Sequence, residues 1–356
     1  MKVAPLFHAL APASWCDVRL IHTGQHYDAN MSDAFFRDLA LPEPAHHLEV
    51  GSGTHAEQTG RTMIAYEAVC QRERPAAIVV VGDVNATAAC AMVGAKLWIP
   101  VVHLEAGLRS RDRRMPEEIN RLVTDALADL LWTPSPDADA NLRAEGVAPE
   151  RIELIGNIMI DSFEMLRERI ERAGTARRLG VADAPYAVVT LHRPSNVDDR
   201  AALAELVDRL EDVAARMKIV FPIHPRTRKR LQDFRLERRI TGNPRILATE
   251  PLGYLEFMNL VMGCAMAITD SGGVQEETTY LGIPCVTLRE NTERPITVTA
   301  GTNRLVRPSD LPMAAAQVLA GKWAKGAVPE HWDGHTAERA AGSLERFLGA
   351  RAPRQV

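Results

Sequence analysis

Residues 269–277 read Thr-Asp-Ser-Gly-Gly-Val-Gln-Glu-Glu and form the most informative stretch of the chain. The apolar run Cys264–Ile268 before it predicts a buried strand, and Thr278–Gly282 after it continues a helix that stops at a glycine. A Ser-Gly-Gly turn between strand and helix lets the backbone approach an anion, which then faces the free N–H groups and the positive dipole end of the helix. An ordinary strand–turn–helix with a Gly turn gives the same pattern and stays open as the alternative.

Glu277 lies four residues after Gly273, about one turn into this helix. A carboxylate at that place repels phosphate, but it suits the paired hydroxyl groups of a ribose. The stretch therefore predicts a cradle for a nucleoside diphosphate, with the diphosphate at the helix start and the ribose at Glu277.

Length and composition bound the class of protein. The chain has 356 residues, enough for two domains that each bury a core. With 42 Lys and Arg against 46 Asp and Glu, its net charge of −4 argues against nucleic acid as the main partner. The five cysteines show no C-x-x-C spacing, which favours reduced thiols over metal ligands or disulfides. No apolar run approaches a membrane span and no secretory signal is visible, so we expect a cytoplasmic protein without a membrane partner.

Short apolar runs alternate with helical patterns along the whole chain. The alternation predicts parallel sheets with helices on both faces. One helical face is clear between Leu203 and Met217. The predicted strands are Val18–Ile21, Ala77–Val81, Pro100–His103, Tyr186–Leu191, Lys218–Pro222, Arg245–Ala248, Cys264–Thr269 and Pro284–Leu288.

Polar clusters follow these strands. In open α/β sheets ligands bind at the carboxyl ends of strands, so clusters from both halves of the chain predict one cleft between two domains. The clusters are His22–His26, Gly82–Asn85, Glu105–Arg109, His192–Ser195, His224–Arg226 and Asp270–Gly273.

The start of the chain departs from this pattern. Met1–Leu10 predicts a helix with no strand before it, although a doubly wound domain normally begins with a strand that becomes central in its sheet. We therefore expect that the first N-terminal strand and its loop, about 12–15 residues, are missing from the chain as numbered.

Taken in order, these motifs resemble those of the non-hydrolysing UDP-N-acetylglucosamine 2-epimerases, and the resemblance runs from Lys2 to about residue 345. An ordered set of this kind is far more specific than any one motif. The matching stretches are Lys2–Leu6, Gly24–His26, Gly82–Asp83, His103–Arg109, Pro116–Arg121, Gly156–Asn157, His192–Arg193, Pro222–Pro225, Asp270–Glu277, Thr292–Pro295 and Gly301–Thr302.

The resemblance implies an α/β fold of two Rossmann-like domains that face a cleft, as in the B-type glycosyltransferases. Residues 1–166 would form an N-terminal domain with the sugar-side carboxylates, 167–185 a linker, and 186–335 a UDP-binding domain. Residues 336–356 would form a C-terminal helix that returns to the N-terminal domain.

The activity that the resemblance implies is the interconversion of UDP-N-acetylglucosamine and UDP-N-acetylmannosamine, which supplies sugars for cell-surface polysaccharide. UDP leaves C1 as the C2 proton is removed, which gives 2-acetamidoglucal, and UDP then adds back with a proton on the other face. The family also implies a homodimer and no cofactor, neither metal nor nicotinamide. A hydrolysing 2-epimerase that releases N-acetylmannosamine and UDP, and a B-type UDP-sugar glycosyltransferase, remain as alternatives.

Site residues carry over from the family by motif. The catalytic positions are Asp83, Glu105, Glu117 and His192. The substrate-binding positions are Lys2, Arg193, His224, Leu252, Phe257, Ser271, Gly272, Gly273, Glu277 and Arg294. Among these, Leu252 and Phe257 match the contacts to uracil, whereas residues 271–273, Glu277 and Arg294 match those to diphosphate and ribose.

Several of these residues also have a structural interpretation. Asp83 and Glu117 are placed to cap or open a helix, and Glu105 could pair with Arg109 one turn further on. His192 and His224 could be satisfied histidines at strand ends, and Phe257 could serve core packing.

Overall fold

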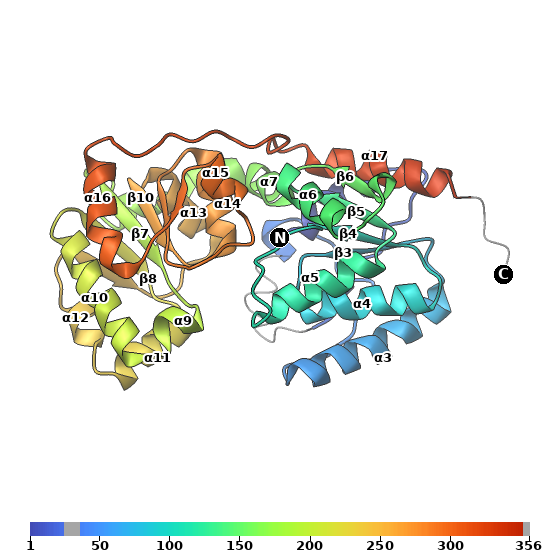
Figure 1. Cartoon of the computed structure of the whole chain (residues 1–356), viewed down its shortest axis with the longest axis horizontal. Helices are drawn as coiled ribbons and strands as arrows, with labels where there is room; N and C mark the ends of the chain where they lie inside the picture. The colour runs from blue at the N-terminus through green and yellow to red at the C-terminus, as the bar shows by residue number, and fades with distance from the viewer. Residues whose placement is uncertain (25–35, 352–356) are drawn as a thin grey trace. The chain divides into compact units, whose positions relative to one another are not determined.

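The computed structural model of the chain describes residues 1–24 and 36–351. It consists of two compact units, one of Met1–Met165 with Glu330–Val356 and one of Leu166–Pro329 (Figure 1). The boundary between them lies within helix α7 (Ile158–Arg172). Residues 167–185, expected as a linker, hold the end of α7 and the short helix α8 (Thr175–Arg178) and belong to the second unit.

The first unit is built on a parallel sheet in the order β3-β4-β5-β6. A second parallel sheet, the pair β1-β2, is not hydrogen-bonded to it within the described residues. Its strands are β1 (Ile21–His22), β2 (His46–His47), β3 (Ile78–Val81), β4 (Val101–Leu104), β5 (Leu130–Thr133) and β6 (Ile152–Leu154). Its helices are α1 (Val3–Leu10), α3 (His55–Glu73), α4 (Asn85–Lys96), α5 (Pro116–Leu127), α6 (Pro136–Ala144) and α17 (Thr336–Gly349), with a 3₁₀ turn at Pro149–Arg151.

Two apolar cores lie on the two faces of this sheet. One joins α3 and α4 to Ile78 and Val80 of β3. The other joins α1 and α17 to Val102 and Leu104 of β4. Because successive side chains of a strand point to opposite faces, strands buried on both sides are mostly apolar, as the all-buried β4 and β5 are except at His103 and Thr133. Within the first unit α17 is tied to β5 by a hydrogen bond from Trp132 Nε1 to Ser343 Oγ at 2.8 Å.

The second unit is built on a six-stranded parallel sheet in the order β12-β11-β10-β7-β8-β9. Its strands are β7 (Tyr186–Thr190), β8 (Lys218–Pro222), β9 (Ile246–Thr249), β10 (Met266–Thr269), β11 (Cys285–Thr287) and β12 (Asn303–Leu305). Its longer helices are α10 (Arg200–Ala214), α11 (Pro225–Asp233), α13 (Tyr254–Gly263), α14 (Gly272–Leu281) and α16 (Leu311–Leu319). The shorter ones are α9 (Pro194–Val197), α12 (Glu237–Thr241) and α15 (Ile296–Thr299), with a 3₁₀ turn at Pro308–Asp310.

The strand order of the second unit reverses between β7 and β10, because later strands are added outward from β7 on one side and from β10 on the other. In open α/β sheets the ligand crevice lies outside the carboxyl ends of the strands at such a reversal. His192 follows β7 and residues 270–273 follow β10, so both clusters lie at this point.

The predicted fold class is confirmed, since both units are α/β with parallel sheets. Each predicted strand has a counterpart, although β1 contains only Ile21 and His22. The face predicted between Leu203 and Met217 is buried, with Met217 beyond the end of α10. Four strands were not predicted: β2, β5, β6 and β12.

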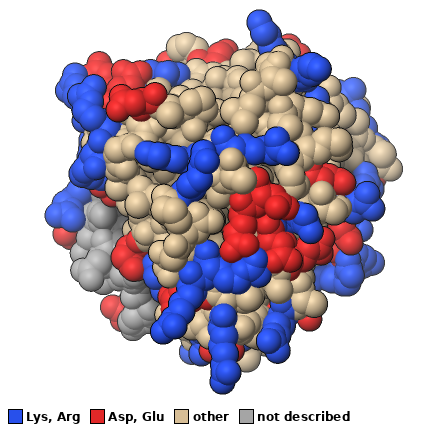
Figure 2. All heavy atoms as spheres, turned by 90° about the vertical axis from the view of Figure 1, so that its left-hand side faces the viewer, with Lys and Arg blue, Asp and Glu red and all other residues tan. Residues whose placement is uncertain are grey.

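Two further observations concern the hydropathy of the helices and the charges on the surface. No helix in the described residues 1–24 and 36–351 is long and apolar enough to cross a membrane. On the face drawn in Figure 2, basic and acidic side chains lie next to one another, in keeping with the near balance of charge in the sequence.

Candidate functional site

Glu105 occupies a strained backbone position directly after β4. Its φ is +73°, a left-handed conformation that non-glycine residues seldom adopt and that tends to occur at functional sites. One carboxylate oxygen, Oε2, accepts from Lys2 Nζ. The other, Oε1, is buried and accepts no hydrogen bond from any described residue. Glu105 is thus a buried carboxylate with one oxygen left for a ligand.

The proposed structural pair of Glu105 with Arg109 does not form. Arg109 instead pairs with Glu145 at 2.6 Å and with Asp125 at 2.7 Å. Lys2, one of the positions expected to bind substrate, is the partner of Glu105.

Asp83 is held by a neighbouring helix rather than capping one. Its Oδ2 accepts from Arg121 Nη1 at 2.5 Å, and its backbone carbonyl accepts from Asn120 at 2.9 Å. The N-cap of α4 is Val84, so the capping interpretation of Asp83 is wrong. Because Arg121 is almost fully buried, it fixes the Asp83 carboxylate at the end of β3.

Glu117 and Glu118 differ in role although they are neighbours at the start of α5. Glu118 is buried and accepts from the backbone N–H groups of Ser110 and Arg111 and from Arg121, so it holds the loop after β4. Glu117 is exposed in the first turn of α5. It precedes Asn120 and Arg121 by three and four residues, so it shares the helix face that contacts Asp83.

A buried pair supports these carboxylates from beneath. His103 Nδ1 lies 2.6 Å from Asp125 Oδ1, and His103 Nε2 lies 2.8 Å from the Gly82 carbonyl. Burial lowers the pKa of His103, but the Asp125 carboxylate and the Gly82 carbonyl outweigh it, so the pKa is raised from its ordinary value. With both ring nitrogens hydrogen-bonded, His103 fixes Gly82 and therefore the loop that carries Asp83.

In the second unit, Asp270 organises the loop that carries His192 and Arg193. Its buried carboxylate lies 2.9 Å from His192 Nδ1 and accepts from the backbone N–H of His192 at 2.9 Å and of Arg193 at 2.8 Å. Asn196 adds a fourth contact at 3.0 Å. Burial raises the pKa of Asp270, but these donors outweigh it and keep the pKa below its ordinary value. The carboxylate is therefore ionised and orients the His192 ring.

His224 caps a helix and also lies beside His192. Its Nδ1 accepts from the backbone N–H of Arg226 at 3.2 Å, which caps α11. Its ring centre also lies 5.4 Å from that of His192. Burial and the neighbouring His192 lower the pKa of His224, so the ring is neutral near pH 7.

The start of α14 combines free space with a fixed cation. Ser271 is the N-cap and makes no side-chain cap hydrogen bond. Arg294 Nε lies 2.8 Å from Glu276 Oε1, and Arg294 Nη1 contacts Glu293 Oε1. A Cβ atom at Gly272 would meet that Arg294–Glu293 pair at 2.6 and 2.8 Å, whereas a Cβ atom at Gly273 would meet nothing within 4 Å. Gly272 thus admits the guanidinium, and Gly273 leaves the helix start open to a ligand.

This difference predicts opposite outcomes for two adjacent substitutions. Gly272→Ala forces the Arg294–Glu293 pair to move, and overpacking of this kind costs about 1–3 kcal/mol, or roughly 2–10 °C in Tm for a domain of this size. Gly273→Ala has room and gains helix propensity, so its Tm is expected to be unchanged or higher. Thermal unfolding followed by circular dichroism of both variants compares them, and equal losses would contradict the proposed packing.

Glu277 lies on α14 and accepts from Tyr254 Oη at 2.7 Å. Burial, which the Tyr254 hydrogen bond only partly offsets, raises the pKa of Glu277 to about 8. Tyr254 is the first residue of α13 and follows Leu252 by two positions. Its contact therefore brings the loop with Leu252 and the first turns of α13, including the half-buried Phe257, toward Glu277.

The structure adds residues that the sequence did not single out as site residues. They are Arg121, which holds Asp83, Asp270, which holds His192, Tyr254, which holds Glu277, and the carboxylates Glu276 and Glu293 around Arg294. Asp270, Glu276 and Glu293 lie inside the matching motifs, so their positions were visible without their partners. Gln25 and His26 of the expected motif at 24–26 lie outside the described residues.

Comparison with known proteins shows that most of the chain matches one protein family. The model of the UDP-N-acetylglucosamine 2-epimerase family matches residues 8–345. The chain belongs to the UDP-N-acetylglucosamine 2-epimerase family. This confirms the resemblance from the motifs and makes the protein an epimerase by family.

Relatives extend over most of the chain. The UDP-N-acetylglucosamine 2-epimerase of Methanocaldococcus jannaschii is 44% identical over 311 residues, 86% of this chain and 85% of that protein. The UDP-2,3-diacetamido-2,3-dideoxy-D-glucuronate 2-epimerase of Pseudomonas aeruginosa is 38% identical over 308 residues, 85% of this chain and 84% of that protein. A crystal structure of the M. jannaschii enzyme in complex with UDP-GlcNAc and UDP superposes with a TM-score of 0.88 at 40% identity, and covers 97% of this chain and 96% of that one.

Proposed function

We propose that the protein interconverts UDP-N-acetylglucosamine and UDP-N-acetylmannosamine without hydrolysis. The observation that carries the proposal is that one set of residues suits the binding of a nucleotide and another set suits proton transfer. The second unit has an open helix start beside an arginine and a buried carboxylate, and the first unit has carboxylates held at strand ends. The M. jannaschii relative, solved with UDP-GlcNAc and UDP, supports this substrate.

For the nucleotide, we propose that the diphosphate binds the backbone of residues 271–273, with Arg294, and that the ribose hydroxyls donate to Glu277. Leu252 and Phe257 would contact the uracil. His192 and Arg193, both fixed by Asp270, would lie beside the diphosphate as it leaves. A developing negative charge is stabilised best by donors already in place.

For the sugar, we propose that Asp83, Glu105 and Glu117 act at C2. The C2–H bond has no adjacent carbonyl to acidify it, so its proton leaves as the C1–O bond to UDP breaks. The electron pair of the C–H bond becomes the C1=C2 double bond of 2-acetamidoglucal. Addition of UDP at C1 and of a proton at the other face of C2 gives the manno isomer. A proton is removed from one face of C2 and another is delivered to the opposite face, so proton acceptors and donors are needed on both sides. A set of three carboxylates can supply them.

The test is proton NMR of UDP-N-acetylglucosamine incubated with the protein in heavy water. The proposal predicts deuterium at C2, appearance of the manno isomer, and no accumulation of free sugar and UDP in equal amounts. Equal release of N-acetylmannosamine and UDP would instead identify a hydrolysing 2-epimerase. Transfer only to an added acceptor would identify a glycosyltransferase. UDP-2,3-diacetamido-2,3-dideoxy-D-glucuronate, the substrate named for the P. aeruginosa relative, is the comparison substrate.

Binding of UDP is expected to release a proton near pH 7. In the free protein the pKa of Glu277 is raised to about 8, so the carboxyl is mostly protonated at pH 7. Ribose hydroxyls donate to the ionised form and favour it, so affinity is expected to rise with pH up to about 8 and then level off. Calorimetry in buffers of different ionisation enthalpy measures the released proton. The same proton count for the wild type and Glu277→Gln would contradict this assignment.

We also propose that the protein acts as a homodimer in the cytoplasm and supplies N-acetylmannosamine-type sugars for cell-surface polysaccharide. Light scattering coupled to size-exclusion chromatography tests the dimer, and a mass of one chain at all concentrations would contradict it.

A further inference from the structure

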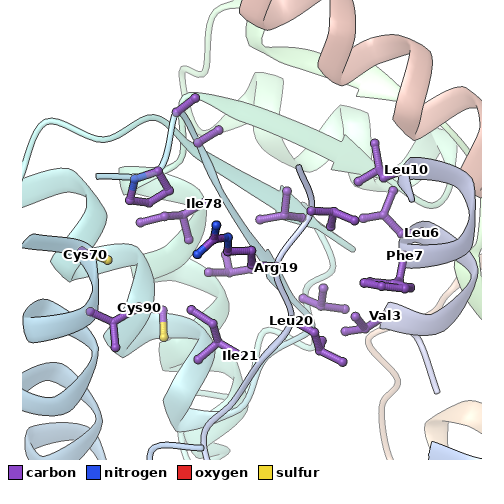
Figure 3. A pocket seen from close by; sticks show the side chains of 18 of the residues that line it. Val3, Leu6, Phe7, Leu10, Arg19, Leu20, Ile21, Cys70, Ile78 and Cys90 are labelled. Atoms are coloured by element: carbon purple, nitrogen blue, oxygen red, sulfur yellow. The ribbon is translucent and has the colours of Figure 1, made fainter. Parts of the chain in front are cut away.

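Each unit contains a feature that the proposed reaction does not explain. The first unit has a largely apolar cavity of about 790 Å³ beside β3, lined by side chains such as Leu6, Ile21 and Ile78 (Figure 3). None of the residues proposed for the site is among the described residues that line it. The second unit has a group of buried charged side chains beside the start of α14, and this group bears on the binding of the nucleotide.

Four charged side chains form a series of ion pairs beside the start of α14. Arg289 Nη2 lies 2.7 Å from Glu293 Oε2, and the other oxygen of Glu293, Oε1, contacts Arg294 Nη1. Arg294 Nε in turn lies 2.8 Å from Glu276 Oε1. Each of the four side chains is at most 8% exposed. Glu293 therefore bridges two arginines, and Arg294 lies between two carboxylates.

The backbone of Arg294 is held separately from its side chain. Its N–H donates to Thr292 Oγ1 at 3.1 Å, and Thr292 Oγ1 donates to Gln275 Oε1 of α14 at 2.8 Å. With the backbone fixed in this way, the direction of the guanidinium depends on Glu293 and Glu276. Because the guanidinium is rigid and planar, carboxylates at Nη1 and Nε together set the orientation of the whole group.

Arg289 balances the charge of this group. Arg294 with Glu276 and Glu293 alone would carry one positive and two negative charges, which would repel a diphosphate, and Arg289 makes the two signs equal. Burial raises the pKa of Glu293, but the Arg294 and Arg289 guanidinium groups outweigh it and keep the pKa below its ordinary value, so Glu293 is ionised. Arg289 Nη1 is buried without a hydrogen-bond partner among the described residues. A buried donor without a partner is costly, and such costs are typical of functional sites.

We propose that Glu293 and Arg289 are positioning residues for the diphosphate. Glu293 fixes the guanidinium of Arg294, and Arg289 fixes Glu293 and balances its charge. Both act through Arg294 and need no contact with the nucleotide of their own. The proposal rests on the function proposed above, in which Arg294 binds the diphosphate at the start of α14.

The test compares the affinities for UDP and for uridine, which differ only in the diphosphate. Arg289→Met is expected to weaken UDP binding at least ~10-fold, the lower end of what a hydrogen bond to a charged group contributes, and to leave uridine binding unchanged. Arg289→Lys restores a charge and a donor and is expected to recover most of the UDP affinity. Calorimetry measures UDP binding, and NMR titration measures uridine binding. Arg216→Met removes an exposed arginine of the same unit and is the control.

A double variant shows whether Arg289 acts through Arg294. Arg294→Met alone is expected to weaken the binding of UDP and not that of uridine. If Arg289 acts only through Arg294, Arg289→Met/Arg294→Met binds UDP no more weakly than Arg294→Met does. Losses that add would give Arg289 an independent role and overturn the proposal.

Because Arg289→Met leaves Glu293 with a single arginine, Tm is measured for each variant. If Arg289→Met does not fold, Arg289→Met/Glu293→Gln replaces it, since removal of both charges leaves no buried charge unpaired, and the same selective loss of UDP affinity is expected. Equal losses of UDP and uridine affinity, or an unchanged UDP affinity in a folded variant, overturn the positioning role while Arg294→Met still weakens UDP binding. An unchanged UDP affinity in Arg294→Met would contradict the placement of the diphosphate itself, and the positioning role with it.

Discussion

Replacing Glu105 by Gln is expected to lower turnover at least ~100-fold, the usual size of a general acid–base contribution. The substitution keeps the shape of a side chain that is buried and contacts Lys2, but removes its capacity to take a proton. Asp83→Asn and Glu117→Gln are expected to have effects of the same order. UDP affinity should hardly change in any of the three, because we place these residues at the sugar. Turnover is measured by C2 deuterium incorporation and UDP affinity by calorimetry.

Glu150→Gln is the matched control, since Glu150 is an exposed glutamate of the same unit in the 3₁₀ turn Pro149–Arg151. It should behave as wild type. If one of the three variants kept near-normal turnover, that residue would return to a structural role. For Asp83 this is the ion pair with Arg121, and for Glu117 it is the first turn of α5.

Replacing Glu277 by Ala is expected to weaken UDP binding between ~10- and ~150-fold, because a hydrogen bond to a charged group contributes about 1.5–3 kcal/mol. The lost group is the only acceptor that we assign to the two ribose hydroxyls. Tyr254 also loses its partner, since its Oη donates to Glu277. Calorimetric titration with UDP measures the change.

Glu205→Ala removes an exposed glutamate from α10 of the same unit and serves as the control. To separate lost ribose contacts from a disturbed fold, Tm is measured for Glu277→Ala and Glu277→Gln. An unchanged UDP affinity in a folded Glu277→Ala protein would rule out the placement of the ribose.

Apart from β5, the central strands could be predicted from the sequence because burial on both faces leaves a continuous apolar run. Lys218–Pro222 was predicted with the bounds it has in the structure, and the runs at β7 and β10 were equally clear. Edge strands such as β6 and β12 are short, with charged residues inside them, so their sequences resemble loops. Their pairing with β5 and β11 is what makes them strands.

The candidate site shows the same limit. Glu277 was placed correctly on α14, and the turn predicted at residues 271–273 proved to be the N-cap and first two residues of that helix, because their spacing is local. The partners that fix the other side chains are distant in sequence. Lys2 is 103 residues from Glu105, and Arg121 is 38 residues from Asp83. No local pattern carries such a pair, and this is why the alternative interpretation of Glu105 as a partner of Arg109, four residues away, was wrong.

The left-handed backbone of Glu105 bears on how the protein would respond to selection in the laboratory. A non-glycine residue at φ of +73° costs the folded state about 1–3 kcal/mol, and glycine would remove that strain together with a buried carboxylate. A library screened for heat resistance alone would therefore enrich Glu105→Gly, and with the role at C2 that we propose for Glu105 the enriched variants would be inactive. With that proposed role, stability and turnover are opposed at this one residue, so selection for robust variants has to include the reaction itself in every round.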